Sequence, residues 1–229
     1  LAIRVKISAR AAAMPSMEFG YRSVMAKTGY DGAARLARLA DALDGPGEGL
    51  PSLFCLTDPE RTPDLKALAH ALPDGAGLIL RLFGRDELHA QAADLVTIRH
   101  DKGGVCLIAA EPELAAEIGA DGVHWPERWL SGAHVRRSHG LISTSAHSPS
   151  ALRRAQGLAD LAFVSTVFPS RSPSAARPMG AFRLAALARS HSMPVYALGG
   201  VNTRTIKRLN HLGISGVGAV GALSGSTRT

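Results

Sequence analysis

With 229 residues, of which 46% are hydrophobic and 20% charged, the chain is long enough to bury one full core and has the composition of an ordinary globular domain. No apolar run reaches the roughly 18 residues that a membrane-spanning helix needs, so no membrane partner is expected. The formal net charge of +7 comes mainly from arginines spread along the chain without a basic block. This pattern argues against nucleic acid as a partner and suits an anionic small-molecule substrate.

The N-terminal part of the chain divides into a leader and a helix. Residues 1–30 show no regular period and are rich in Ala, Arg and Ser, so we expect a disordered leader or an over-extended start, with a targeting peptide as the alternative. Residues 31–47 are predicted to form an N-terminal helix and a linker. Leu36, Leu39 and Leu43 recur there at helical spacing before a break rich in Gly and Pro.

Short apolar runs alternate with amphipathic stretches from residue 53 onward. Eight runs are each predicted to be a buried strand: 53–56, 77–82, 105–109, 122–124, 141–144, 161–164, 195–198 and 216–220. Such alternation, at about 20–25 residues per unit, favours a parallel sheet closed as a (β/α)8 barrel, one domain over 52–223. A doubly wound open sheet is the alternative. A sheet of that kind typically has a Gly-rich turn after its first strand. This chain has Thr57-Asp58-Pro59 there, which favours the barrel.

The end of the chain bears on the packing of the N-terminal helix. The last apolar run is followed by few residues before Thr229, so the eighth helix of the barrel is expected to be short or missing. We therefore predict that the N-terminal helix packs on the barrel and covers the apolar surface left open there. Its buried leucines would each contribute roughly 1.5–3 kcal/mol.

The two cysteines, Cys55 and Cys106, each lie inside one of the apolar runs. A disulfide framework or a zinc site needs more ligands than these two thiols. Both are therefore predicted to be reduced, buried core residues of a cytoplasmic protein.

Polar and small residues gather where three consecutive strands of the predicted barrel end. They are Ser170, Arg171 and Ser172 after the sixth strand, Gly199 and Gly200 after the seventh, and Val220 and Gly221 after the eighth. Hydroxyls, a guanidinium and exposed backbone N–H groups are the donors that bind an oxyanion. Functional groups of a barrel sit at the carboxyl ends of its strands, and phosphate is often held after the seventh and eighth. These residues are predicted to hold a phosphate.

Four runs, at 119–124, 145–148, 167–172 and 197–202, stand in the order and spacing of the thiamine-phosphate synthase family. Over 52–223 the chain resembles this family, which includes thiazole tautomerases. Family synthases are barrels that join an aminopyrimidine diphosphate to a hydroxyethylthiazole phosphate and release pyrophosphate, with Mg²⁺ on the leaving group. The resemblance also implies a homodimer.

By position, the resemblance assigns roles to the predicted phosphate residues. Ser170 and Ser172 fall on the family's two thiazole-phosphate threonines, Gly199 or Gly200 on its phosphate-binding glycine, and Val220 and Gly221 on its last backbone contact. Ser145 falls on a serine at the pyrophosphate side, and Arg81 aligns with an arginine after the second strand.

The chain departs from the family where the family holds its metal. Ala110 and Trp129 fall on the two acids that bind Mg²⁺, and Pro173 falls on a supporting lysine. Ala and Trp offer no oxygen ligand for a hard dication, so no metal-binding residue is predicted. Mg²⁺ is implied only if the chain is a true synthase.

Three functions follow from this resemblance. The expected one is a synthase of thiamine biosynthesis in which Arg81, Arg85 or Arg171 supplies positive charge at the pyrophosphate. One alternative is a metal-independent tautomerase acting on a thiazole carboxylate phosphate, with His147, at the family's strand-five histidine, as general base. His147 is alternatively a cap of the helix that follows it. The other alternative is a non-catalytic binder or regulator that keeps only the phosphate site.

Overall fold

The computed structural model describes residues 30–45, 49–58, 61–82, 88–170, 172 and 177–220. The strands are β1 (Leu53–Leu56), β2 (Gly77–Leu80), β3 (Cys106–Ala109), β4 (Gly122–Trp125), β5 (Leu141–Ala146), β6 (Leu161–Val164), β7 (Val195–Ala197) and β8 (Gly216–Ala219). The α-helices are α1 (Tyr30–Asp41), α2 (Leu65–Ala71), α3 (His89–Asp101), α4 (Pro112–Glu117), α5 (Gly132–Arg137), α6 (Pro149–Ala155) and α7 (Ala181–Arg189). Two short 3₁₀ helices are η2 (Glu127–Trp129) and η3 (Ile206–Leu209).

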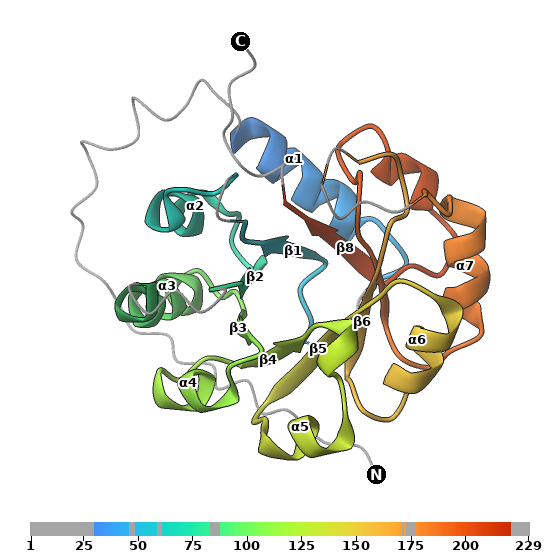
Figure 1. The fold of residues 1–229 in the computed structure, drawn as a ribbon. Coiled ribbons are helices and arrows are strands. Elements are labelled where there is room, and N and C mark those ends of the chain that lie inside the picture. The colour runs from blue at the N-terminus through green and yellow to red at the C-terminus, as the bar shows by residue number, and fades with distance from the viewer. Residues whose placement is uncertain are drawn as a thin grey trace.

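The eight strands close into a parallel barrel in chain order, surrounded by helices (Figure 1). Each strand pairs with the next, and β8 returns to β1 with Val217 opposite Leu53. The predicted (β/α)8 barrel is confirmed, and the open-sheet alternative is wrong, since an open sheet has no pairing between its first and last strands.

Most of the strands are apolar on both faces because each face meets its own hydrophobic layer. Inside the barrel, the rings of Phe54, Phe163 and Tyr196 pack edge to face, with the Phe54 centroid 5.3 Å from that of Phe163 and 5.6 Å from that of Tyr196. Outside, residues of the intervening positions pack against the helices. This double burial explains why the runs read as continuous apolar segments rather than as alternating ones.

The elements differ from the sequence prediction in two places that position the site. Strand β5 extends to Ala146 rather than ending at residue 144, so His147 follows its last residue directly. Between β7 and β8 the described chain forms only the short helix η3. In the turn before η3, Asn202 Oδ1 accepts hydrogen bonds from the backbone N–H groups of Arg204 and Thr205.

Helix α1 contacts β1, β8 and η3 on the outside of the barrel. Its apolar face is buried through Ala33, Leu36 and Ala40, and Leu43 just beyond its end is buried as well. The helix thus covers barrel surface next to the strand that closes the sheet (Figure 1). The predicted leader and the region of the eighth helix lie outside the described residues, except that Tyr30 already belongs to α1.

Both cysteines are fully buried free thiols, as the apolar runs around them predicted. Burial raises the pKa of the Cys55 thiol to about 12 and also raises the pKa of Cys106. Both thiols therefore stay protonated at neutral pH and are unsuited to act as nucleophiles.

One buried charge braces the amino-terminal half of the barrel. The guanidinium of Arg99, on α3, donates hydrogen bonds to four backbone carbonyl oxygens, those of Ala69, Leu72, Pro73 and Ala76. These carbonyls belong to the last turn of α2 and to the loop that follows it, so Arg99 supplies donors that the helix end lacks. Two of them have a second donor, since the Leu72 carbonyl also accepts from Lys102 Nζ and the Pro73 carbonyl from the backbone N–H of Ala76.

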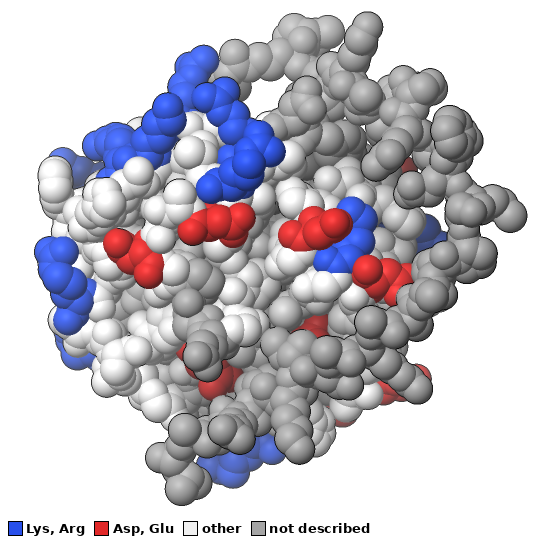
Figure 2. Space-filling view, turned by 180° about the vertical axis from the view of Figure 1, so that it is seen from behind, with Lys and Arg blue, Asp and Glu red and all other residues white. Residues whose placement is uncertain are grey.

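Charge on the face seen in Figure 2 is divided rather than continuous. Lys and Arg gather toward the upper left edge, while Asp and Glu form a line across the middle. Such a face lacks the unbroken basic stripe that a nucleic-acid backbone requires. In the part of the chain that the structure describes, none of the helices is both long enough and apolar enough to span a membrane.

Candidate active site at the carboxyl ends of the strands

The loops after β6 and β7 are tied together by backbone hydrogen bonds. The N–H of Val167 donates to the carbonyl of Leu198, and the N–H of Phe168 donates to that of Gly199, each at 3.0 Å. These bonds continue the pairing of the two strands beyond their ends. They bring the start of the serine loop beside the glycine pair.

Gly199 and Gly200 both have left-handed backbone conformations, with φ of +87° and +67°. A Cβ atom on Gly200 would lie 2.4 Å from the carbonyl oxygen of Pro169 and 2.6 Å from that of Phe168. Both neighbours are backbone atoms, so they cannot move aside as a flexible side chain would. Glycine is therefore required for the two loops to touch.

Ser170 and Ser172 stand at this junction and are half-buried. The Ser170 hydroxyl oxygen accepts a hydrogen bond from the backbone N–H of Ser172 at 3.2 Å, so the loop turns back on itself. Val220, after β8, packs partly buried against the inner core. Arg171 and Gly221, also predicted for this site, lie outside the described residues.

Sequence reasoning missed the residues that hold the glycine turn. Thr205 donates its hydroxyl hydrogen to the carbonyl of Gly200 at 2.9 Å, and its oxygen accepts the backbone N–H of Asn202 at 2.9 Å. Asn202 in turn accepts two backbone N–H groups. The spacing Asn-x-x-Thr, which begins one residue after the Gly-Gly pair, is a turn signal that could have identified them.

Ser145 belongs to a polar chain inside the barrel. The ring of His124 lies between two hydroxyls, with Nδ1 2.8 Å from Ser143 Oγ and Nε2 3.1 Å from Ser145 Oγ. Burial, with a smaller contribution from the positive charge of Arg81, lowers the pKa of His124 to about 3. His124 is thus neutral at physiological pH and holds the Ser145 hydroxyl in place, while Ser145 itself is half-exposed.

Arg81 follows β2 and is anchored to the end of β1. Its backbone N–H donates to Thr57 Oγ1 at 2.8 Å, and its guanidinium donates to the Thr57 carbonyl and lies 3.5 Å from the Asp58 carboxylate. Burial is the larger influence and lowers the pKa of Arg81 from its ordinary value, while Asp58 opposes that effect. The positive charge predicted for this site is therefore partly balanced by a neighbouring acid.

His147 is paired with Glu127. Glu127 Oε2 accepts hydrogen bonds from both the backbone N–H and the ring Nδ1 of His147, each at 2.8 Å. The cap of α6 is instead Ser148, whose Oγ accepts the N–H of Ala151 at 3.1 Å. The capping interpretation of His147 is therefore not needed to explain why α6 begins there.

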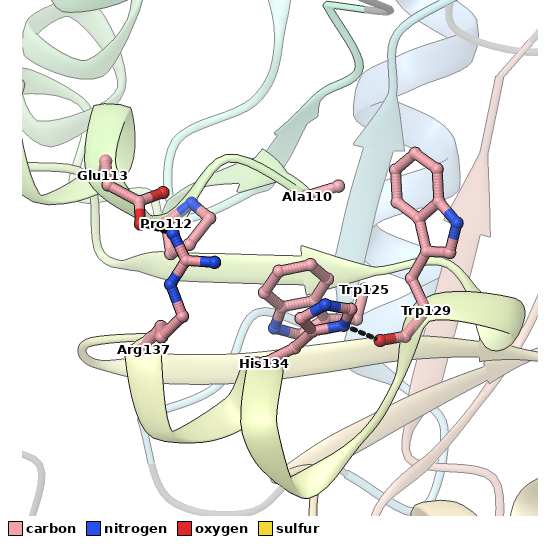
Figure 3. Close-up of a pocket in the computed structure, with 7 residues that line it drawn as sticks. All are labelled: Ala110, Pro112, Glu113, Trp125, Trp129, His134 and Arg137. Atoms are coloured by element: carbon pink, nitrogen blue, oxygen red, sulfur yellow. Dashed lines mark hydrogen bonds and ion pairs between the residues drawn. The ribbon is translucent and has the colours of Figure 1, made fainter.

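Ala110 and Trp129, which the resemblance aligned with metal-binding acids, help to line a cavity of about 440 Å³ between α4 and α5. Ala110 lies at its edge, and the ring of Trp125 stacks on that of His134 with centroids 4.8 Å apart (Figure 3). Trp129, 45% exposed, points away from this pair, and Arg137 reaches toward Glu113 on the opposite wall. The cavity thus presents aromatic surface where a metal site would present carboxylates.

Among the described residues, the acids at this end of the barrel are paired with basic side chains rather than gathered around one point. Glu111 lies 2.9 Å from His89, Asp58 contacts Arg81, and Glu127 contacts His147. Among the residues described, no three His, Cys, Asp or Glu side chains stand close enough to hold a metal ion. The residues present therefore do not fit a Mg²⁺ ion at Ala110 and Trp129.

A family model, curated relatives and a solved structure all match this chain to proteins named for thiamine phosphate. The family described as thiamine monophosphate synthase matches residues 53–223. The chain is 30% identical over 195 residues to thiamine-phosphate synthase of Alcanivorax borkumensis, covering 80% of this chain and 90% of that protein. It is 31% identical over 183 residues to thiamine-phosphate synthase of Ruminiclostridium cellulolyticum, covering 75% and 87%. Thiamine phosphate pyrophosphorylase from Pyrococcus furiosus has the same fold, with a TM-score of 0.68 and 22% identity over 76% of this chain and 88% of that one.

Proposed function

The chain belongs to the thiamine monophosphate synthase family, and from this premise we propose that it is a thiamine-phosphate synthase of thiamine biosynthesis. It joins an aminopyrimidine diphosphate to a hydroxyethylthiazole phosphate. The bond from the pyrimidine methylene carbon to the diphosphate oxygen breaks, and its electron pair leaves with pyrophosphate. The thiazole nitrogen forms the new bond to that carbon, which gives thiamine phosphate.

One observation carries the proposal: the contact between the serine loop and the glycine pair. Gly200 lies against the carbonyls of Phe168 and Pro169, so Ser170, the next residue of that loop, comes close to the glycine turn. Ser170, Ser172, Gly199 and Gly200 then hold the thiazole phosphate, together with Arg171, Val220 and Gly221. Hydroxyl and backbone N–H donors around one anion replace its water shell without a metal ion.

The other substrate lies toward β2 and β5. Ser145, with its hydroxyl held by His124, contacts the diphosphate. Arg81 contributes positive charge, which Asp58 partly balances. Because the residues present do not fit Mg²⁺ at Ala110 and Trp129, no step of this account depends on a metal ion. The protein is further proposed to work in the cytoplasm, as a homodimer.

A second candidate function is favoured by the His147–Glu127 pair. A tautomerase that acts on a thiazole carboxylate phosphate moves one proton from one atom of the substrate to another, so its product is an isomer and no metal is required. His147 accepts and returns that proton. The same phosphate residues hold this substrate, so binding of thiazole phosphates does not separate the two candidates.

A turnover assay distinguishes the synthase from the tautomerase. Purified protein is incubated with hydroxyethylthiazole phosphate and the aminopyrimidine diphosphate, with and without Mg²⁺, and thiamine phosphate is measured by chromatography. Formation of thiamine phosphate supports the synthase. Isomerisation of the thiazole carboxylate phosphate without condensation supports the tautomerase. Binding with neither reaction means that the chain is a non-catalytic thiazole-phosphate binder, and the enzymatic proposal fails.

A matched pair of variants tests the phosphate site. Ser170→Ala removes a hydroxyl from the proposed site, and Ser192→Ala removes an exposed one from the turn before β7, at the opposite end of the barrel. A hydrogen bond to a charged group contributes about 1.5–3 kcal/mol, so Ser170→Ala should raise the Kd for hydroxyethylthiazole phosphate at least about tenfold. Ser192→Ala should leave it unchanged. If both variants bind hydroxyethylthiazole phosphate with the same Kd, Ser170 is not part of the phosphate site.

A further inference from the structure

We propose that Glu127 is a positioning residue that fixes the ring tautomer of His147 and leaves its Nε2 as the proton acceptor at the barrel mouth. The inference deepens the second candidate function, proton transfer at His147, and rests on it. It assigns a role to a residue that sequence reasoning did not place in the site.

The hydrogen bonds define the tautomer. An ionised carboxylate can only accept hydrogen bonds, and Glu127 Oε2 is 2.8 Å from Nδ1 of His147. The ring proton must therefore be on Nδ1, so in the neutral imidazole the lone pair is on Nε2. The backbone N–H of His147 donates to the same oxygen at 2.8 Å, which fixes the carboxylate relative to the strand end as well as to the ring.

The carboxylate is itself held from its other side. Glu127 Oε1 lies 3.3 Å from a guanidinium nitrogen of Arg154, on α6. Glu127 therefore bridges the helix after β5 to the turn of η2 after β4, and its side chain is about three-quarters covered, at 26% exposure. A carboxylate fixed by three donors has little freedom to rotate away from the ring.

His147 lies at the carboxyl end of β5, the end of the barrel where the loops of the candidate site meet. Ser143 and Ser145 both reach His124 inside the barrel, and residues two apart on a strand share a face. His147 comes directly after the last residue of β5, two residues beyond Ser145. Its side chain is 49% exposed, so a substrate can reach the ring. Next to it, the N–H of Ser165 donates to the carbonyl of Ala146, which joins this strand end to the start of the phosphate loop.

A purely structural role would use the same contacts to join two loops, so the test needs a measurement that such a role does not change. The ring nitrogens of ¹⁵N-histidine-labelled protein report the tautomer directly by long-range ¹H–¹⁵N correlation NMR. The wild type should show His147 with its proton on Nδ1. Glu127→Ala should show a mixture of the two tautomers, and Glu127→Gln, whose amide oxygen can still accept from Nδ1, should keep the wild-type pattern.

Kinetics give the second readout. On the thiazole carboxylate phosphate, Glu127→Ala should lower kcat at least about tenfold, as expected for loss of an oriented general base, with KM unchanged. Glu127→Gln should recover most of the rate. Glu113→Ala is the matched control, because Glu113 makes an exposed ion pair with Arg137 on a neighbouring helix, and it should change neither the tautomer nor kcat.

Two results would overturn the proposal: a wild-type ring that carries its proton on Nε2, or a Glu127→Ala variant that keeps the Nδ1 tautomer. The NMR measurement needs no substrate. The protein could be inactive on the thiazole carboxylate phosphate while Glu127→Ala loses the Nδ1-protonated tautomer of His147. In that case the tautomerase function is wrong, and the positioning role of Glu127 is supported.

Discussion

Gly200→Ala tests the contact on which the proposed phosphate site depends. Alanine at this position adds one methyl group in a left-handed backbone conformation, with φ of +67°. That conformation alone costs about 1–2 kcal/mol for a residue with a Cβ atom. The new atom would also lie 2.4 Å from the Pro169 carbonyl oxygen, well inside contact distance, so the two loops must separate.

A control within the chain isolates the effect of the clash. Gly157 has φ of +82°, and a Cβ atom there would meet nothing within 4 Å. Gly157→Ala should therefore cost only the conformational term, about 1–2 kcal/mol. Gly200→Ala should cost more than this in urea unfolding, and it should also raise the Kd for hydroxyethylthiazole phosphate more than about tenfold, because the donors of the two loops no longer converge.

Both variants are measured by urea unfolding and by isothermal titration calorimetry with hydroxyethylthiazole phosphate. Gly157→Ala should be destabilised and bind normally. If Gly200→Ala binds as tightly as Gly157→Ala, the contact between the serine loop and the glycine turn does not form the phosphate site, and the reasoning is refuted.

Four further variants test other parts of the structure by urea unfolding. Arg99→Met removes the guanidinium donor from four backbone carbonyls, of which those of Ala69 and Ala76 lose their only side-chain donor among the hydrogen bonds described, and should cost at least about 3 kcal/mol; a cost below about 1 kcal/mol would contradict this role. Leu36→Ala, in the helix that covers the barrel, should cost about 2–5 kcal/mol, and a neutral result would mean that the helix does not pack there. Burial lowers the pKa of His124 to about 3 from 6.5, so the unfolded chain binds a proton that the folded chain excludes. The free energy of unfolding should thus fall by about 1.4 kcal/mol per pH unit as the pH drops below about 6.5, and His124→Gln should lack this slope. Ala110 has φ of +63°, a conformation that Asn adopts more easily, so Ala110→Asn should stabilise the protein by about 1 kcal/mol, and a loss of stability would oppose the argument.

The barrel could be predicted from the sequence because burial on both faces leaves a signal in each strand. Eight apolar runs of similar length define the strands, and the strand ends then identify where polar residues meet. The glycine pair after β7 and the serines after β6 were found in this way. Their contact follows from the pairing of β6 with β7, which is a property of the fold and not of one particular side chain.

The interactions that orient individual side chains could not be predicted. Glu127 and His147 are 20 residues apart and come from the loops of different strands, so no local pattern joins them. The same holds for His124 and Ser145, which meet only because adjacent strands place them on the same inner face. The left-handed backbone at Ala110 also left no signal, since alanine is unusual in that conformation.

The most direct test of the account is a crystal structure of the protein with hydroxyethylthiazole phosphate. We predict that the phosphate lies between the loops after β6, β7 and β8, within hydrogen-bond distance of Ser170 Oγ and of backbone N–H groups of the Gly199-Gly200 turn. A phosphate bound instead in the cavity between α4 and α5, or a ligand held away from these strand ends, would contradict the central claim.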